Sequence, residues 1–245
     1  NSRVSNYCCS DDWTRGGPVS VNMPIVQTIG KGAFLDCMQL QNVQIPLASN
    51  IGEYAFSNCY MISQIDLSNA TYLGNKLFYM DDRITDANYI PALQYVQLSD
   101  ELEMIPNDCF SGCSNLTSIT LPASLKSIGY DALPYIMDVQ LPNGITSVGR
   151  GNFVKATSIS IPANVTSWES YSPSWQDVYC YLVAPPAFRV FYNDNTSSAT
   201  LHVPAISLGA YKLNENWYKF GKIVPVDGVI DDLNINSELT LLTTD

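Results

Sequence analysis

The feature that most constrains this chain is a segment that recurs about every two dozen residues. The stretch GAFLDCMQLQNVQIP at residues 32–46 returns as YAFSNCYMISQIDLS at 54–68 and as DCFSGCSNLTSITLP at 108–122. Each copy contains a tripeptide in which one outward residue lies between two apolar ones, and nine such tripeptides can be aligned. Their central residues follow one another at steps of 22, 22, 31, 23, 20, 20, 19 and 23. This period predicts a solenoid of stacked repeats.

Within one repeat, the order of residue types predicts a strand, a turn and a helical stretch. The tripeptide matches the two-residue period of a strand that has one buried side. Proline follows six of the nine tripeptides, as expected where a strand ends, because proline has no N–H to donate. An Ile-Gly pair such as Ile51-Gly52 then opens a turn. An Ala-Phe pair such as Ala55-Phe56 follows, and we expect it to form a short helical turn with an inward ring.

Stacking is required because one such coil cannot bury its apolar side alone. We expect nine parallel strands about 4.8 Å apart, which make a sheet roughly 40 Å long. Right-handed winding is the default for parallel crossovers. The predicted fold class is therefore an α/β solenoid. It is a right-handed leucine-rich repeat with a parallel β-sheet on one face and short helical turns or loops on the other.

The repeat also divides the chain into segments. We expect a linker or ragged cap over residues 1–18, the repeat array of about nine strands over 19–204, and a C-terminal cap over 205–226. In that cap, residues 207–220 suit a short amphipathic helix, GKIVPV suits a final strand, and Trp217 and Phe220 are expected to seal the core. Residues 227–245 form a tail without a clear period. The chain begins with neither Met nor a signal peptide, which we interpret as a mature form or a fragment that lacks its targeting segment.

Composition excludes several classes of partner. Charged residues make up only 14% of the chain, against roughly 25% in typical soluble domains. The net charge of −11 would repel a phosphate backbone, so we expect no nucleic acid partner. No apolar run approaches the roughly 18 residues of a membrane helix, so we expect no membrane span in this chain. The remaining partners are protein or polysaccharide.

The repeat phase accounts for five of the seven cysteines. Cys37, Cys59 and Cys113 each lie three residues after the Phe of their repeat. Cys109 takes the Ala position, and Cys180 takes an inward strand position. These residues are predicted to be buried as small hydrophobic side chains, with a metal site or redox pair as the alternative. The phase does not explain Cys8 and Cys9.

Two repeats carry a specific family resemblance. Ile51-Gly52, Ala55-Phe56 and Cys59, followed by Ile62, Ile65 and Leu67, resemble the BspA-type leucine-rich repeat of bacterial surface proteins. The residues Phe110, Cys113, Leu116, Ile119, Leu121 and Pro122 resemble it again. The segment VYCYLVAPPAF also resembles the closing segment of Bacteroides-like members. The resemblance covers roughly residues 21–226, and the departures are the long step around 79–95 and the altered Ala-Phe positions at Leu133 and Phe153. It implies an extracellular or cell-surface protein used for adhesion or host-matrix binding.

Catalytic and cofactor motifs are lacking. The only histidine is His202, which excludes a two-His zinc motif and leaves it as the only base for a Ser-His or Cys-His site. No Gly-rich phosphate loop occurs. Asp66 is expected to face Gln44 and Gln97 rather than a second acid, which argues against a glycoside hydrolase with paired carboxylates. We therefore predict no catalytic residue, no cofactor and no metal. A glycoside hydrolase with paired carboxylates is the least favoured hypothesis.

The outward side of the predicted sheet is the first candidate for binding. It offers amides, hydroxyls and a few tyrosines, and aromatic residues often dominate the energy of an interface. The candidate binding face comprises Gln44, Asp66, Tyr95, Gln97, Thr120, Gln140, Ser160, Tyr179, Tyr181 and His202.

The long step supplies a second candidate. Residues 79–95 carry about nine residues more than a regular repeat, and insertions in solenoids are often binding loops. A tolerated surface excursion is the alternative. The candidate loop residues are Asp81, Asp82, Arg83 and Asp86.

Both candidates lead to a non-catalytic scaffold that binds protein, with the host extracellular matrix as one possible target. A polysaccharide-binding accessory protein of a gut bacterium is the alternative. A lipid anchor supplied by a segment outside this chain stays open.

Overall fold

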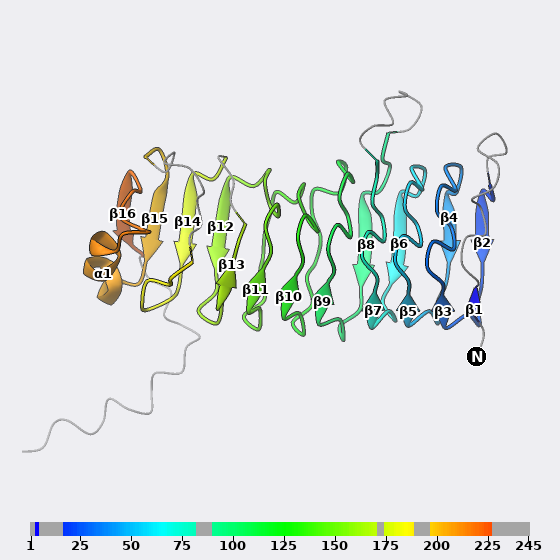
Figure 1. Ribbon diagram of the computed structural model, residues 1–245, viewed down its shortest axis with the longest axis horizontal. Helices are drawn as coiled ribbons and strands as arrows, with labels where there is room; N and C mark the ends of the chain where they lie inside the picture. Colours follow the sequence, from blue (N-terminus) through cyan, green and yellow to red (C-terminus); the bar gives the residue numbers. More distant parts are fainter. Residues whose placement is uncertain (1–2, 5–16, 82–89, 171–173, 189–196, 227–245) are drawn as a thin grey trace, which may run out of the picture.

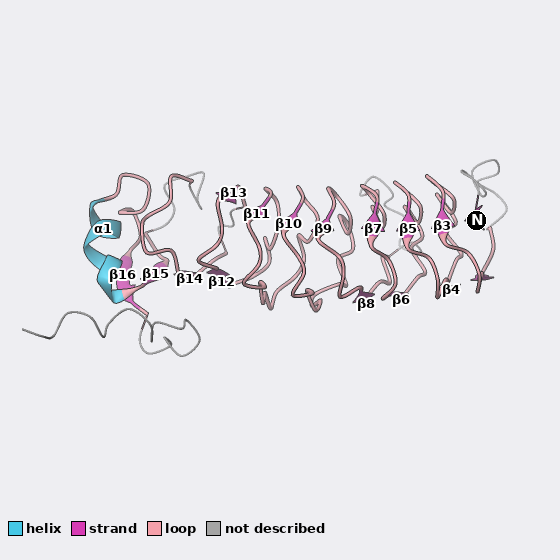
Figure 2. Ribbon diagram, turned by 90° about the horizontal axis from the view of Figure 1, so that it is seen from below, coloured by secondary structure: helices cyan, strands magenta, loops and turns pink. Residues whose placement is uncertain are grey.

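The computed structural model is an elongated solenoid of stacked coils (Figure 1). The structure describes residues 3–4, 17–81, 90–170, 174–188 and 197–226. Its strands form two rows along the solenoid, one of short strands that ends at Trp168 and one of longer strands that is interrupted between residues 98 and 158. Figure 2 shows these rows on opposite sides. The right-handed winding and the segment boundaries stay predictions, and the tail at 227–245 lies outside the described residues.

The first row, called the long-strand row, carries the strands expected from the tripeptides. The members are parallel to their paired neighbours, as in the four-strand register Ser158, Asp177, Thr200 and Lys222. Inward residues such as Ile65 and Ile159 are 3% and 1% exposed. Parallel strands with an apolar inner side are therefore confirmed. The row comprises β2 (Ser20–Asn22), β4 (Asn42–Gln44), β6 (Gln64–Leu67), β8 (Tyr95–Leu98), β12 (Ser158–Ile161), β14 (Asp177–Cys180), β15 (Thr200–Val203) and β16 (Lys222–Pro225).

Two of the nine expected strands do not form. Residues 119–121 and 139–141 run between β8 and β12 without strand pairing. Their inward side chains still face the core: Val139 is buried, and Ile119 packs against the buried cluster. Burial of alternate side chains sets which way a residue faces, whereas a ladder also needs neighbouring backbones in register. The alternation of apolar and polar residues therefore predicted correctly which side chains point into the core, but it predicted wrongly that these two segments pair as strands.

The second row, called the short-strand row, was not expected as a sheet. Each of its strands has two residues, and the second residue is the apolar member of the Ile-Gly pair or its equivalent. Parallel pairing links Ile29, Ile51 and Leu73 in one sheet and Ile105, Ile128, Val148 and Trp168 in another. The prediction of a sheet on one face only is thus corrected. The row comprises β1 (Arg3–Val4), β3 (Thr28–Ile29), β5 (Asn50–Ile51), β7 (Tyr72–Leu73), β9 (Met104–Ile105), β10 (Ser127–Ile128), β11 (Ser147–Val148) and β13 (Ser167–Trp168).

The Ala-Phe segments form turns where helical turns were expected. The residue before each pair has a positive φ, for example 57° at Tyr54 and 58° at Gly32, and a helix cannot pass through that conformation. The N–H groups bond to the neighbouring coil instead: the N–H of Phe34 donates to the carbonyl of Ala55 at 2.8 Å. These segments therefore link coils as the strands do.

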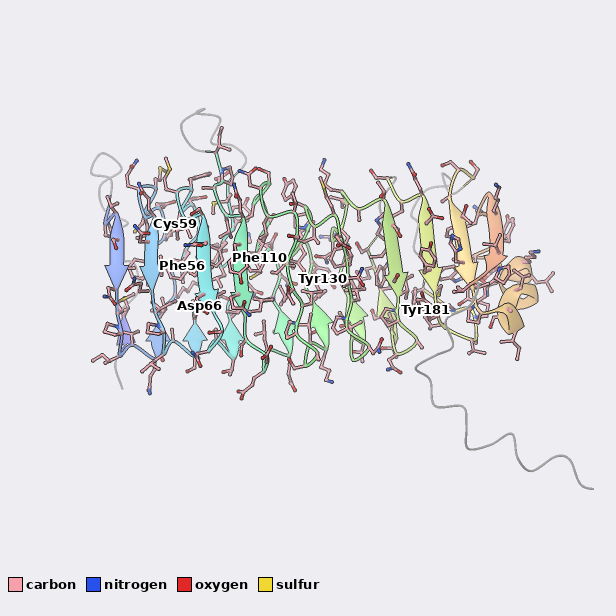
Figure 3. The ribbon with its side chains drawn as sticks, turned by 180° about the vertical axis from the view of Figure 1, so that it is seen from behind. Phe56, Cys59, Asp66, Phe110, Tyr130 and Tyr181 are labelled. Atoms are coloured by element: carbon pink, nitrogen blue, oxygen red, sulfur yellow. The ribbon has the colours of Figure 1, made fainter. Side chains whose placement is uncertain are left out.

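A stack of phenylalanine rings fills the core of the first coils. Phe34, Phe56, Phe78 and Phe110 lie with ring centroids 5.3, 5.4 and 5.7 Å apart and interplanar angles of 7°, 12° and 6°. All four rings are at most 4% exposed, and Phe56 and Phe110 are labelled in Figure 3. The stack continues across the long step, because β6 and β8 pair in register from Gln64–Tyr95 to Leu67–Leu98. The insertion leaves the coil on either side of it unchanged.

A buried asparagine replaces alanine in one coil. Asn152 is fully buried, and its Oδ1 accepts a hydrogen bond from the N–H of Leu133 at 2.8 Å. Its Nδ2 donates to the carbonyls of Gly129 and Gly149, both at 2.8 Å. The side chain thus joins its own coil to the preceding one through backbone groups that would otherwise lack these partners.

The C-terminal end carries the helices of the described chain. The 3-10 helix η1 (Ala205–Ser207) leads into α1 (Leu208–Leu213), and β16 then pairs with β15. Trp217 is fully buried, stacks on Phe220 at 6.2 Å, and donates from Nε1 to the carbonyl of Pro186 at 3.0 Å. These aromatic side chains cover the apolar interior at this end.

Replacing Phe56 with alanine should lower the free energy of unfolding by about 3–5 kcal/mol, because a fully buried ring leaves a cavity between two stacked neighbours. Phe56→Leu is the matched control and should cost clearly less, since it retains most of the volume. Urea unfolding monitored by circular dichroism measures both. A loss below about 1 kcal/mol for the alanine variant would contradict the role of the ring stack.

Candidate functional site: the long-strand face

The long-strand face consists of the outward side chains of the long-strand row and of the unpaired segments that continue it. All ten residues of the candidate binding face are exposed or half-buried there or directly beside it. The structure gathers most of them into two clusters, one around Tyr95 and one around Tyr179. Gln44 lies on β4, outside both clusters.

Tyr95 stands between two adjoining hollows. Its side chain is 57% exposed, and its hydroxyl donates to Oε1 of Gln97 at 2.9 Å. One hollow, of about 410 Å³, lies toward β6 and includes Gln64 and Asp66. The other, of about 330 Å³, lies toward the unpaired segments and is lined by Val96, Ser118, Ile119, Thr120, Leu121, Asp138 and Gln140 together with Tyr95 and Gln97.

The second hollow coincides with the break in the strand ladder. Because 119–121 is not paired as a strand, β8 has no neighbouring strand on that side. The polar rim is partly self-bonded, since Nε2 of Gln140 donates to Oδ1 of Asp138 at 3.3 Å. An aromatic ring beside amide, hydroxyl and carboxylate groups can bury apolar surface and exchange hydrogen bonds with one ligand.

The second cluster is an aromatic shelf on β14 and β15. The rings of Tyr179 and His202 stack with centroids 4.2 Å apart and an interplanar angle of 13°. Nε2 of His202 lies 2.8 Å from Oδ1 of Asp177, so the imidazole is held by a carboxylate on the neighbouring strand. Tyr181 follows β14, and burial followed by the nearby Tyr179 raises its pKa above the ordinary value.

The shelf does not form a Ser-His pair. Ser160 is in register with Tyr179, which is in register with His202. The serine hydroxyl is therefore two strand spacings, roughly 9–10 Å, from the imidazole, beyond hydrogen-bond reach. The arrangement suits recognition, in which the stacked rings offer a flat surface.

The candidate loop is described only at its first residue. Asp81 is held in place because its N–H donates to Oδ1 of Asn58 at 2.9 Å and its carbonyl accepts from the Tyr60 hydroxyl at 3.1 Å. Asp82, Arg83 and Asp86 lie outside the described residues. The loop therefore stays a prediction.

The cysteines divide into free thiols and one disulfide. Cys59, Cys109, Cys113 and Cys180 are free and buried, and burial raises the pKa of each thiol above its usual value, which makes them poor nucleophiles. Cys37 is buried as predicted, but it is disulfide-bonded and not a free hydrophobic side chain. Its partner is not among the described residues, and Cys8 and Cys9 also lie outside them.

Among the described residues, no group of three or more His, Cys, Asp or Glu side chains is placed to hold a metal ion. Within the same residues, no helix is both long and apolar enough to cross a membrane.

The structure also contains a hollow that sequence reasoning missed. It lies on the short-strand row and includes Ser127, Ser147 and Ser167, which precede the apolar residue of three successive coils. The sequence signal for this hollow is a serine that recurs every 20 residues, directly before the apolar residue of each coil.

Comparison with known families identifies the repeat. The BspA type Leucine rich repeat region matches residues 18–97 and 87–174 in six copies. The chain belongs to the BspA-type leucine-rich repeat family. A comparison with curated proteins found no match.

Solved structures support the fold of this BspA-type chain. A leucine-rich repeat protein from Bacteroides ovatus superposes with a TM-score of 0.56 at 22% identity over 85% of this chain. The chain spans 61% of the length of that protein. Weaker matches are the pneumococcal vaccine antigen PcpA, with a TM-score of 0.43 at 16% identity over 86% of this chain and 68% of that one, and a leucine-rich cell surface protein from Faecalibacterium prausnitzii, with 0.33 at 15% over 93% and 84%.

The disulfide at Cys37 predicts how many thiols can be titrated before and after reduction. Unfolded but unreduced protein should titrate fewer than its seven cysteines with a thiol reagent, and prior reduction should expose all seven. Reduction should also lower the thermal midpoint, because the cross-link restricts the unfolded chain. Cys59→Ser, which leaves Cys37 intact, serves as the control and should keep the effect of reduction on the midpoint. Seven thiols before reduction would contradict the bond.

Stability should fall at alkaline pH. Burial, followed by the charge of Asp81, raises the pKa of Tyr60 from 10.0 to about 12. The unfolded chain therefore loses this proton first, so the contribution of Tyr60 to stability decreases as the pH rises from about 10 to about 12. Buried thiols whose pKa is also raised, such as Cys59, add to the decline. Urea midpoints at pH 9, 10 and 11 measure the decline. Tyr60→Phe removes one of these groups and should make the slope between pH 10 and 11 shallower, whereas an unchanged slope would contradict the assignment.

Proposed function

We propose that this chain is a non-catalytic binding scaffold that recognises a protein partner through the long-strand face. The observation that carries the proposal is the presence of two aromatic anchors on one polar face. Tyr95 lies on β8, and the stacked Tyr179 and His202 lie on β14 and β15. Four coil steps separate β8 from β14, which corresponds to about 19 Å or more, because two of the coils between them are not paired as strands on this face.

That separation favours a macromolecular ligand. A small molecule fills one pocket, whereas a protein interface buries about 800 Å² on each partner and can reach both anchors. The residues between them, such as Thr120, Gln140 and Ser160, are exposed or half-buried hydrogen-bonding groups. Aromatic anchors surrounded by such groups match the usual organisation of protein interfaces.

The cellular location belongs to the proposal. We place the protein outside the cell or on its surface, with adhesion, including to host matrix, as its role. Two observations support this. One is the disulfide at Cys37, since disulfides persist in oxidising compartments. The other is membership of the BspA-type family, whose repeat is typical of bacterial surface proteins.

Binding to immobilised collagen, fibronectin and laminin, measured beside a glycan array, tests the proposal. A protein on the panel should bind saturably. Tyr95→Ala and Tyr179→Ala should each weaken that binding about tenfold or more, because each removes an exposed aromatic anchor. Both positions are solvent-exposed or half-buried, so the fold should remain intact.

Tyr72→Ala is the matched control, since Tyr72 is 48% exposed on the short-strand row. It should leave the affinity unchanged. Equal affinity for the wild type and both anchor variants would refute the use of this face. Binding confined to the glycan array would favour the polysaccharide alternative, and turnover of a glycan that depends on Asp66 or His202 would favour an enzyme.

A further inference from the structure

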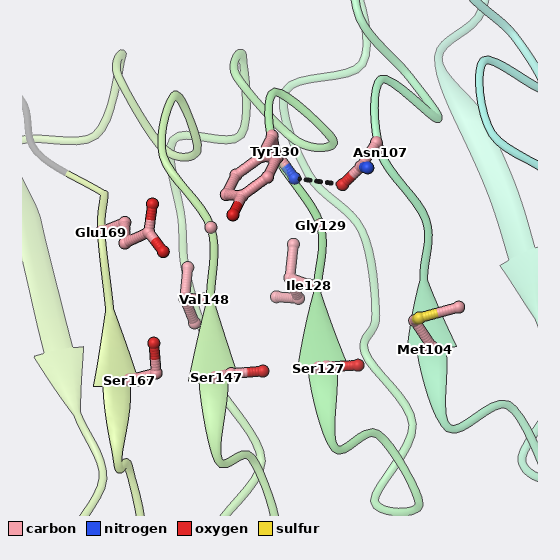
Figure 4. Close-up of a pocket in the computed structure, with 11 residues that line it drawn as sticks. Met104, Asn107, Ser127, Ile128, Gly129, Tyr130, Ser147, Val148, Ser167 and Glu169 are labelled. Atoms are coloured by element: carbon pink, nitrogen blue, oxygen red, sulfur yellow. Dashed lines mark hydrogen bonds between the residues drawn. The ribbon is translucent and has the colours of Figure 1, made fainter.

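A third hollow lies on the short-strand row, on the opposite side of the solenoid from Tyr95. It has a volume of about 350 Å³. We call it the serine pocket, and Figure 4 shows its lining residues. They are Met104, Asn107, Ser127, Ile128, Gly129, Tyr130, Ser147, Val148, Gly149, Ser167 and Glu169.

The floor of the serine pocket is a row of hydroxyls. Ser127, Ser147 and Ser167 occupy equivalent positions on β10, β11 and β13, and the ladder pairs them directly. Adjacent hydroxyls therefore repeat at about 4.8 Å, the spacing of paired strands. None of the three hydroxyls bonds to a described residue, so their donors and acceptors are available to a ligand.

Glycine and tyrosine shape one wall of the pocket. A Cβ on Gly149 would lie 2.6 Å from Cδ1 of Tyr130, so only glycine lets this ring lie against the neighbouring coil. The backbone N–H of Tyr130 donates to Oδ1 of Asn107 at 2.8 Å, and the Arg150 guanidinium lies 5.5 Å from the ring centroid. The ring is 42% exposed and held from several sides.

Earlier coils of the same row carry larger outward side chains. Earlier in the same row, the outward positions hold Asn50 and Tyr72, and Lys31 forms an ion pair with Glu53 at 2.8 Å. Larger side chains occupy that part of the surface. Three small residues in succession leave the space that Tyr130 and Glu169 border.

We infer that the serine pocket binds an uncharged oligosaccharide. Sugar rings have apolar C–H faces that can pack on an aromatic ring and hydroxyl edges that exchange hydrogen bonds with serine. Glu169 is the one charged residue among those lining the pocket, and its carboxylate can accept hydrogen bonds from sugar hydroxyls. The same carboxylate and the net charge of −11 disfavour anionic sugars.

Calorimetric titration of the chain with maltohexaose, cellohexaose, laminarihexaose and xylohexaose tests the inference. At least one should bind saturably. Tyr130→Ala should weaken it about fivefold or more by removing the aromatic wall. Ser147→Val should do the same, because it replaces the central hydroxyl with methyl groups while keeping a side chain that suits a strand.

Glu169→Gln retains the shape of its side chain and provides a third variant if Ser147→Val does not fold. It should also weaken binding by removing the charged acceptor. Tyr72→Ala, on the same row but outside the pocket, and Tyr95→Ala, on the opposite face, should leave oligosaccharide affinity unchanged. The Tyr95 variant also separates this site from the proposed protein-binding face.

Absence of binding by all four hexasaccharides would overturn the inference. Binding that survives Tyr130→Ala together with Glu169→Gln, or that is lost in Tyr95→Ala, would overturn it as well. Capture of a matrix protein that depends on Tyr130 while no hexasaccharide binds would assign the pocket to protein recognition instead.

Discussion

Coil-to-coil contact is the constraint on which the rest of the structure depends. Every described strand bonds to a strand of an adjacent coil, and the Ala-Phe turns add bonds such as Phe34 N–H to the Ala55 carbonyl. The rings of Phe34, Phe56, Phe78 and Phe110 follow the same repeat inside. Hydrogen bonding outside and ring stacking inside thus require the same alignment of coils, and a shift of one coil would break both.

This alignment also creates the functional surfaces. Equivalent outward residues are brought together at strand spacing even though about 20 residues separate them along the chain. Tyr179 meets His202 in this way, and Ser127 meets Ser147 and Ser167. A binding site on such a protein is therefore formed by residues at equivalent positions of successive repeats, and its shape depends on which of these residues are small and which are large.

Much of the architecture could be predicted from residue periodicity, and the errors have physical causes. Alternation of residue types identified Ile65 and Ile159 as inward, because burial follows side-chain polarity. It failed at 119–121, because pairing depends on distances between backbones. The turn at Ala55-Phe56 was misjudged as helical, because the positive φ falls on Tyr54, a residue type that rarely adopts it.

The site was less predictable than the fold. The repeat pattern predicts which residues point outward from the long-strand row. The hollows beside Tyr95 arise from an interrupted strand ladder, which the pattern of apolar residues does not predict. The pairing of His202 with Asp177 depends on strand register. The serine pocket depends on glycines such as Gly149, whose role becomes visible only when Tyr130 is seen to lie against it.

The ring stack has a consequence for how such proteins lengthen their connecting segments in evolution. Phe78 and Phe110 are 32 positions apart, whereas Phe56 and Phe78 are 22 apart, yet both pairs stack at nearly the same distance. Loop closure becomes only slowly less favourable as a chain grows. New segments can therefore enter at this coil junction without disturbing the interior, which makes it a natural place for related proteins to diversify.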